Sequence, residues 1–111
     1  MKVRVTQKHP GRWGYPGRFP TFDAGTAVTL SPDEDKDFLG WYECDIAGHH
    51  TFVPISFVRD GVLMRDYNPT ELFAEVGDVL VVNEIVNAWL LVTDTSGTTG
   101  WITAESVVSK Q

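Results

Sequence analysis

The chain has 111 residues and a formal net charge of −6, so it can form one domain or two very small ones. The excess of acid disfavours general nucleic-acid binding, and no apolar run approaches the roughly 20 residues of a membrane span. Its one cysteine, Cys44, cannot form an intramolecular disulfide, which together with the absence of an apolar leader predicts a soluble, cytoplasmic protein.

Alternating apolar residues in the first half predict short β-strands, beginning with Val3 and Val5. The next stretch, 9–20, is rich in proline, glycine and aromatic residues, and its Pro-Gly steps favour turns. We expect a long, structured loop there. The pattern then predicts strands over 27–30, 40–46 and 51–53, and an exposed acidic loop over 31–37.

The second half, Leu63–Val107, reads as five more short strands with a turn signal between each pair. A β-branched and leucine run, Val79–Val82, follows the turn Gly77-Asp78. Trp89 and Trp101 supply much of the apolar volume that a small β core needs. This half therefore predicts the fold more clearly than the first half does.

Several second-half motifs, taken in order, resemble a bacterial Src-homology-3 (SH3) domain. They are Met64-Arg65-Asp66-Tyr67, Gly77-Asp78, Trp89-Leu90-Leu91-Val92, Ser96-Gly97 and Gly100-Trp101-Ile102. The first half lies over the second as an internal repeat, with Trp41 on Trp89, Gly25 on Gly77, Gly48 on Gly97, Phe52 on Trp101 and Val58 on Val107.

The resemblance implies an all-β fold of two small, five-stranded SH3-like barrels in tandem. The expected domains are 1–60, a divergent barrel with an enlarged first loop, and 61–111, the clearer match. The link Asp60-Gly61 is too short to act as a tether, because one residue spans at most about 3.6 Å. We therefore expect the two barrels to pack closely.

Peptide-binding members of this family hold polyproline segments in a groove lined by aromatic side chains and one proline. The resemblance places this ligand-binding surface on Trp13, Tyr15, Trp41, Pro54 and Phe57 in the first barrel, and on Tyr67 and Trp89 in the second. The second barrel carries Arg65, Thr103 and Ser106 at three other positions of that surface. The first barrel is thus the expected site.

Each of these residues also has a purely structural interpretation. Trp41 and Trp89 can be packing residues, because aromatic side chains dominate small cores. Trp13 and Tyr15 can pin the long loop to the barrel. Cys44 beside His49 and His50 lacks a third orienting group for catalysis. Adjacent histidines on a strand point to opposite faces, so a shared metal is not expected.

The resulting expectation is a non-enzymatic protein-interaction module without cofactor or metal. Its partner is a protein or an extended peptide, held mainly in the groove of the first barrel. One alternative is a rigid structural or self-associating tandem, including a homodimer, in which both grooves are occupied. Another is binding of cell-wall peptides, which bacterial relatives of this fold perform. An enzyme is the least favoured class.

Overall fold

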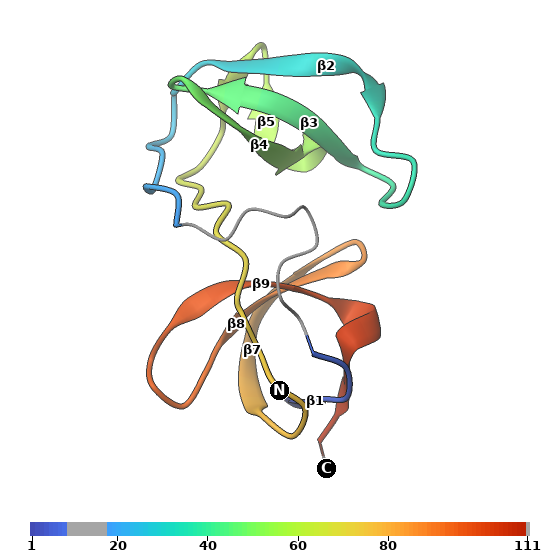
Figure 1. Cartoon of the computed structure of the whole chain (residues 1–111). Helices are drawn as coiled ribbons and strands as arrows, with labels where there is room; N and C mark the ends of the chain where they lie inside the picture. Colours follow the sequence, from blue (N-terminus) through green and yellow to red (C-terminus); the bar gives the residue numbers. More distant parts are fainter. Residues whose placement is uncertain (9–17, 111) are drawn as a thin grey trace. The chain divides into compact units, whose positions relative to one another are not determined.

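The computed structural model describes residues 1–8 and 18–110 (Figure 1). This part of the chain is all β apart from two 3₁₀ turns, as the sequence predicts, and holds no helix long and apolar enough to cross a membrane. The strands are β1 (Lys2–Val5), β2 (Val28–Glu34), β3 (Trp41–Ile46), β4 (His49–Pro54), β5 (Val58–Arg59), β6 (Val62–Leu63), β7 (Val79–Val86), β8 (Trp89–Thr93), β9 (Thr99–Thr103) and β10 (Val107–Ser109). The 3₁₀ turns are η1 (Ile55–Phe57) and η2 (Ala104–Ser106).

The chain divides into two compact units, and the division differs from the expected one. Unit 1 combines Met1–Arg18 with Thr70–Gln111, and unit 2 is Phe19–Pro69. Unit 1 contains a five-stranded sheet in the order β10-β1-β7-β8-β9. Unit 2 contains the sheet β2-β3-β4 and the hairpin β5-β6. The described ladders are open sheets and do not close into the continuous barrels that the resemblance implies.

The expected boundary at Asp60-Gly61 lies inside unit 2, where it forms the turn of the hairpin β5-β6. Val58 pairs with Leu63 and Arg59 with Val62. Both turn residues have positive φ, 53° for Asp60 and 77° for Gly61, as a two-residue hairpin turn that matches the strand twist requires. An Asp-Gly step between apolar residues is a strong hairpin signal. Asp60-Gly61 is therefore a hairpin turn and not the link between two domains.

Strand β1 was expected in the same domain as β2 to β5, but it belongs to unit 1. It lies between β10 and β7 in unit 1, with Val3 opposite Ser109 on one side and Leu80 on the other. Val3 and Val5 are buried in the same apolar cluster as Leu80, Val92 and Ile102. The N-terminal strand therefore completes the sheet and the core formed by the last third of the chain.

In unit 2 the strand β3 shows the alternation expected of a half-buried strand. Cys44 and Ile46 are buried, whereas Glu43 and Asp45 between them are exposed. Strand β2 runs on to Glu34 with a register shift after Leu30, so part of the predicted acidic loop is strand. Pro32 is compatible with this because β2 is an edge strand of its sheet, where a missing N–H leaves no ladder bond unmade.

The two units share a hairpin of the same register followed by a 3₁₀ turn. Trp41 pairs with Pro54 across β3 and β4, and Trp89 pairs with Thr103 across β8 and β9. Pro54 and Thr103 each cap the following turn, with φ and ψ of −69° and 135° in one and −72° and 142° in the other. These pairings agree with the overlay of Trp41 on Trp89 that the sequence indicated.

Candidate functional site

Four of the predicted groove residues lie in unit 2. Trp41 and Pro54 are cross-strand partners. The ring of Phe57 packs edge to face on the ring of Tyr67, with centroids 5.5 Å apart. Tyr67 donates its hydroxyl to the carbonyl of Phe52 at 2.6 Å. Tyr67, which the sequence analysis assigned to the second domain, thus belongs to the same unit as the residues of the first.

All four of these side chains are buried, and Trp41 is the most informative. Strand alternation places Trp41 on the same face of β3 as the exposed Glu43 and Asp45, away from the inward Cys44 and Ile46. Trp41 is nevertheless only 1% exposed. The surface that would accept a peptide beside Trp41 is therefore covered in this conformation.

Trp89 repeats this arrangement in unit 1. Its strand neighbours Leu90 and Val92 belong to the apolar core cluster, so alternation directs Trp89 to the opposite face. Trp89 is 0% exposed. Thr103 and Ser106 stand at two of the positions where the sequence departs from the groove pattern, and both are buried. Their hydroxyl groups are hydrogen-bonded to each other at 2.6 Å.

The two remaining groove residues, Trp13 and Tyr15, lie outside the described residues. The described part of the predicted site is consequently a set of five buried side chains: Trp41, Pro54, Phe57 and Tyr67 in unit 2 and Trp89 in unit 1.

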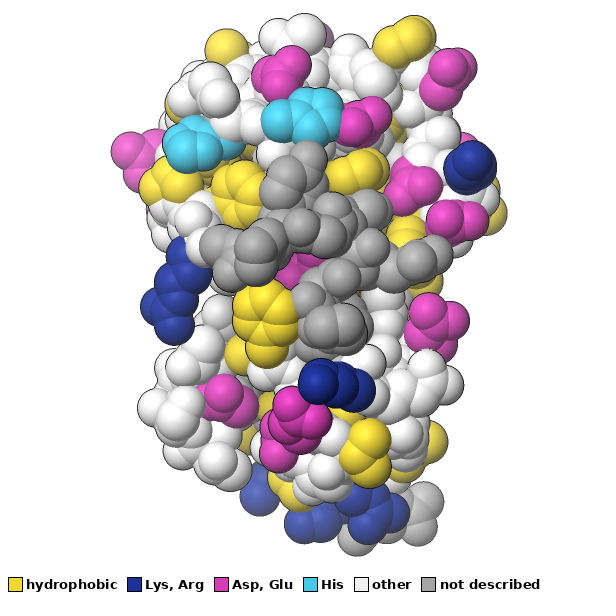
Figure 2. All heavy atoms as spheres, in the orientation of Figure 1, with side chains coloured by type: hydrophobic (Ala, Val, Ile, Leu, Met, Phe, Trp, Pro, Cys, Tyr) yellow, Lys and Arg dark blue, Asp and Glu magenta, His cyan; other side chains and the backbone are white. Residues whose placement is uncertain are grey.

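The exposed part of the same face of unit 2 is acidic. A groove of about 450 Å³ lies along the end of β2, and Asp33, Glu34, Asp35, Glu43 and Phe52 are among the residues that line it. Acidic side chains gather beside the histidines on this part of the surface (Figure 2). The sequence predicted an exposed acidic loop here, but it did not indicate that Glu43 on β3 adds to the same groove.

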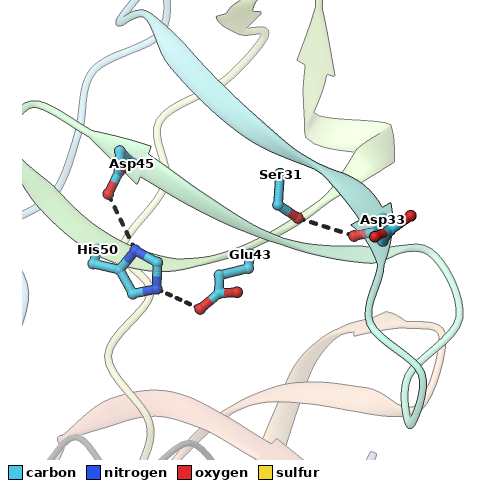
Figure 3. Close-up of polar contacts among 5 residues, drawn as sticks. All are labelled: Ser31, Asp33, Glu43, Asp45 and His50. Carbon is cyan, nitrogen blue, oxygen red and sulfur yellow. Dashed lines mark hydrogen bonds and ion pairs between the residues drawn. The ribbon is translucent and has the colours of Figure 1, made fainter.

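His50 on β4 lies between the carboxylates of Glu43 and Asp45 (Figure 3). Its Nδ1 is 3.1 Å from Asp45 Oδ1 and its Nε2 is 2.5 Å from Glu43 Oε2. The hydrogen bonds to Glu43 and then to Asp45 raise the pKa of His50 above its usual value of 6.5. The arrangement favours the imidazolium form and uses both ring nitrogens.

Neither histidine is hydrogen-bonded to the Cys44 thiol in the described part of the chain. His49 points to the other side of β4, where its ring lies 5.5 Å from that of Phe22, as the expected alternation of adjacent histidines requires. Burial, followed by the charges of Asp45 and Glu43, raises the pKa of the Cys44 thiol to about 12. A thiol with that pKa stays protonated near neutral pH and is a poor nucleophile. Among the described residues no cluster of three or more side chains is placed to hold a metal ion.

Comparison with protein-family models, with curated proteins and with solved structures found no match to this chain.

Proposed function

We propose that this chain is a non-enzymatic protein-interaction module of two SH3-like units, a rigid structural or self-associating tandem whose peptide grooves are already occupied in the folded state. The burial of Trp41 and Trp89 on strand faces that alternation directs outward is the observation that carries this proposal. It favours the closed tandem over capture of an extended peptide by the first groove.

The SH3-like assignment has support in the order of elements. Each unit has a three-stranded antiparallel arrangement, then a 3₁₀ turn, then a short last strand. In unit 1 this strand, β10, pairs with β1 from the start of the chain. In unit 2 the corresponding strand, β5, pairs with β6, which follows it after a two-residue turn. The repeat of this order in both units supports a duplicated SH3-like plan.

Energetics favour closed grooves. A buried aromatic side chain removes about 150–250 Å² from water, which at about 25 cal/mol per Å² is about 4–6 kcal/mol. A peptide that needed Trp41 exposed would have to offset this cost before it gained any affinity. Since each 1.4 kcal/mol is about a tenfold change in Kd, such a peptide would bind roughly a thousandfold to ten-thousandfold more weakly than to an open groove.

A peptide titration followed by NMR tests the proposal. The indole N–H signals of the chain's four tryptophans are assigned with Trp→Phe variants, and a polyproline peptide is added in large excess. We expect the indole signals of Trp41 and Trp89 to stay in place. A saturable shift of the Trp41 indole would overturn the closed-groove proposal and restore the peptide-binding alternative. A peptide-binding SH3 domain titrated in parallel is the control for the peptide itself.

A further inference from the structure

One face of the unit 1 sheet combines exposed valines with cations. Strand register places Arg4 directly opposite Val108 on one side and Val79 on the other, and Lys2 opposite Val81. Lys110 follows Val108 by two residues and therefore lies on the same face. Val81 is 44% exposed and Val108 is 46% exposed. We call Lys2, Arg4, Val81, Val108 and Lys110 the basic sheet face.

This face is not neutralised within the described part of the chain. No carboxylate there forms an ion pair with Lys2, Arg4 or Lys110. The ion pair that lies nearest along the sequence joins Lys8 to Glu75 instead, at 3.8 Å. Cross-strand neighbours lie about 5 Å apart, so the charges and the valines form one continuous surface. An exposed apolar surface carrying charge of one sign is typical of a contact region.

Unit 2 carries the opposite charge on part of its surface. Residues 28–46 contain six acidic residues and one lysine. The groove beside β2 is lined by four acidic residues, Asp33, Glu34, Asp35 and Glu43, together with Ser31, Lys36 and Phe52. It therefore offers an excess of negative charge beside an aromatic residue, which complements the cations and valines of the basic sheet face.

We infer that the basic sheet face of unit 1 docks on the acidic groove of unit 2 in a second copy of this chain. The chain's net charge of −6 opposes association with nucleic acid or an anionic membrane. A protein surface with local negative charge is favoured over these polyanions, and the chain itself carries one. The inference rests on the self-associating form of the proposed function and names its contact surfaces, neither of which includes the buried tryptophans.

The contact joins two different surfaces, so it is heterologous. Such contacts produce rings where the rotation closes and open chains where it does not. Because the charges are exposed and salt screens them, the assembly is expected to weaken steeply as ionic strength rises. The predicted state is thus a concentration-dependent and salt-sensitive series of oligomers.

Paired charge reversals test this inference. One variant carries Lys2→Glu and Arg4→Glu on the basic sheet face, and the other carries Asp33→Lys and Glu43→Lys in the acidic groove. Sedimentation velocity at about 50 mM salt, where screening is modest, should show oligomers for the unaltered chain and monomers for each variant alone. The equimolar mixture should regain complexes, because each variant keeps the surface that the other has lost. The intact basic sheet face of one variant can then dock on the intact acidic groove of the other.

A control variant, Arg18→Glu with Arg59→Glu, changes the net charge by as much as Lys2→Glu with Arg4→Glu does, at exposed positions outside both surfaces. It should associate like the unaltered chain, and far-UV circular dichroism should show that every variant is folded. A monomeric unaltered chain at high concentration overturns the inference. So does a mixture without complexes, or an unaltered chain that stays monomeric but binds DNA or anionic vesicles through Lys2 and Arg4. Failure here leaves the closed-groove proposal standing, because the peptide titration reports on Trp41 and Trp89 alone.

Discussion

Each unit has three consecutive antiparallel strands joined by one long and one short loop, and the order of the two loops differs between the units. In unit 2 the strands β2 and β3 are joined by residues 35–40, and β3 and β4 by the two-residue turn Ala47-Gly48. In unit 1 the two-residue turn, Asn87-Ala88, joins β7 and β8, and residues 94–98 join β8 and β9. The register at the paired tryptophans is unchanged by this exchange. The comparison shows that the hairpin pairing limits variation more than the loops do, as expected when loops lie at the surface.

The interiors differ at matching positions too. Pro54 and Phe57 in unit 2 correspond to Thr103 and Ser106 in unit 1, before and at the end of the 3₁₀ turn. Unit 2 fills this corner with apolar groups, and Phe57 also packs under the guanidinium of Arg65 at 4.2 Å. Unit 1 fills it with a pair of hydroxyl groups that satisfy each other. The same backbone therefore tolerates either solution, provided that no polar group is left unpaired.

The largest expected effect tests whether the stability of unit 1 depends on β1. Val5→Asp buries a carboxylate in the apolar cluster beside Leu80, which should cost about 3–5 kcal/mol of unfolding free energy. Urea denaturation measures the loss, and amide NMR should show that signals of β7 to β10 broaden before those of β2 to β4. Val108→Asp on the exposed face of β10 is the matched control and should stay within about 0.5 kcal/mol. Equal effects of the two substitutions would contradict the placement of β1.

The next effect compares the two tryptophans. If Trp41 and Trp89 are interior residues, Trp→Ala at either position should lower the unfolding free energy by about 3–5 kcal/mol. A tryptophan on an open ligand surface would cost much less, and could even raise stability when removed. Chemical denaturation of both variants separates these outcomes, and a loss below about 1 kcal/mol at Trp41 would favour an open groove in unit 2 alone.

A third effect concerns the pair of hydroxyl groups at the 3₁₀ turn η2 of unit 1, where unit 2 has apolar side chains. Thr103→Val removes one hydroxyl and leaves that of Ser106 buried without its partner, at a cost of about 1–3 kcal/mol. Adding Ser106→Ala removes the orphaned group, so the double variant should lose less than the sum of the two single variants. Additive losses in thermal or urea unfolding would show that the hydroxyl pair does not act as a unit.

A smaller effect concerns the longer turn of unit 1. The Asp94 carboxylate accepts hydrogen bonds from the Ser96 amide at 2.9 Å, the Ser96 hydroxyl at 2.6 Å and the Thr98 amide at 2.9 Å. These bonds, the Ser96 hydroxyl first, hold the pKa of Asp94 below its usual value of 3.8. Asp94→Asn should cost about 0.5–1.5 kcal/mol near neutral pH.

The pH dependence of this Asp94 contribution follows from the sign of the pKa shift. A lowered folded-state pKa means that the stabilisation is complete above pH 3.8 and is lost as the pH falls through the folded value. The difference in unfolding free energy between the unaltered chain and Asp94→Asn should therefore shrink in acid. A difference that stays constant down to low pH would contradict the hydrogen-bonding role of the carboxylate.

The smallest effect belongs to the exposed His50 of unit 2. Its raised pKa means that the added stability is complete below pH 6.5 and is lost as the pH rises through the folded-state value. An NMR titration should place the pKa of His50 above 6.5, and Glu43→Gln should lower it, because that change removes the partner with the largest contribution. An unchanged pKa in Glu43→Gln would contradict the pairing seen in Figure 3.

Local patterns in the sequence predicted the strands but not all of their partners. The alternation over 40–46 predicted β3, and the Trp41–Trp89 overlay predicted the shared register. Val3 and Val5 predicted a strand with one buried face, but the residues around them do not encode which sheet takes it. Asp60-Gly61 did carry a usable signal, since this dipeptide favours a two-residue hairpin turn.

The sequence predicted which residues belong to the candidate site, but it did not predict that their side chains are buried. A tryptophan suits both a ligand platform and a small core, because its large apolar surface serves either purpose. Strand alternation directs Trp41 and Trp89 to the faces opposite their core neighbours, and only the folded chain shows that these faces are covered. The contribution of Glu43 to the acidic groove depends on its cross-strand pairing with Phe52, which the sequence leaves open.

Solvent accessibility of the two indole groups, measured in the peptide-free chain, tests the central claim most directly. A soluble paramagnetic agent broadens NMR signals of protons that water can reach and leaves buried ones sharp. The account predicts that the indole signals of Trp41 and Trp89 stay as sharp as the amide signals of the buried residues Leu80 and Ile102. Broadening of either indole to the level of the amide signal of Leu39, a turn residue that is 74% exposed, would show an open groove and contradict the account.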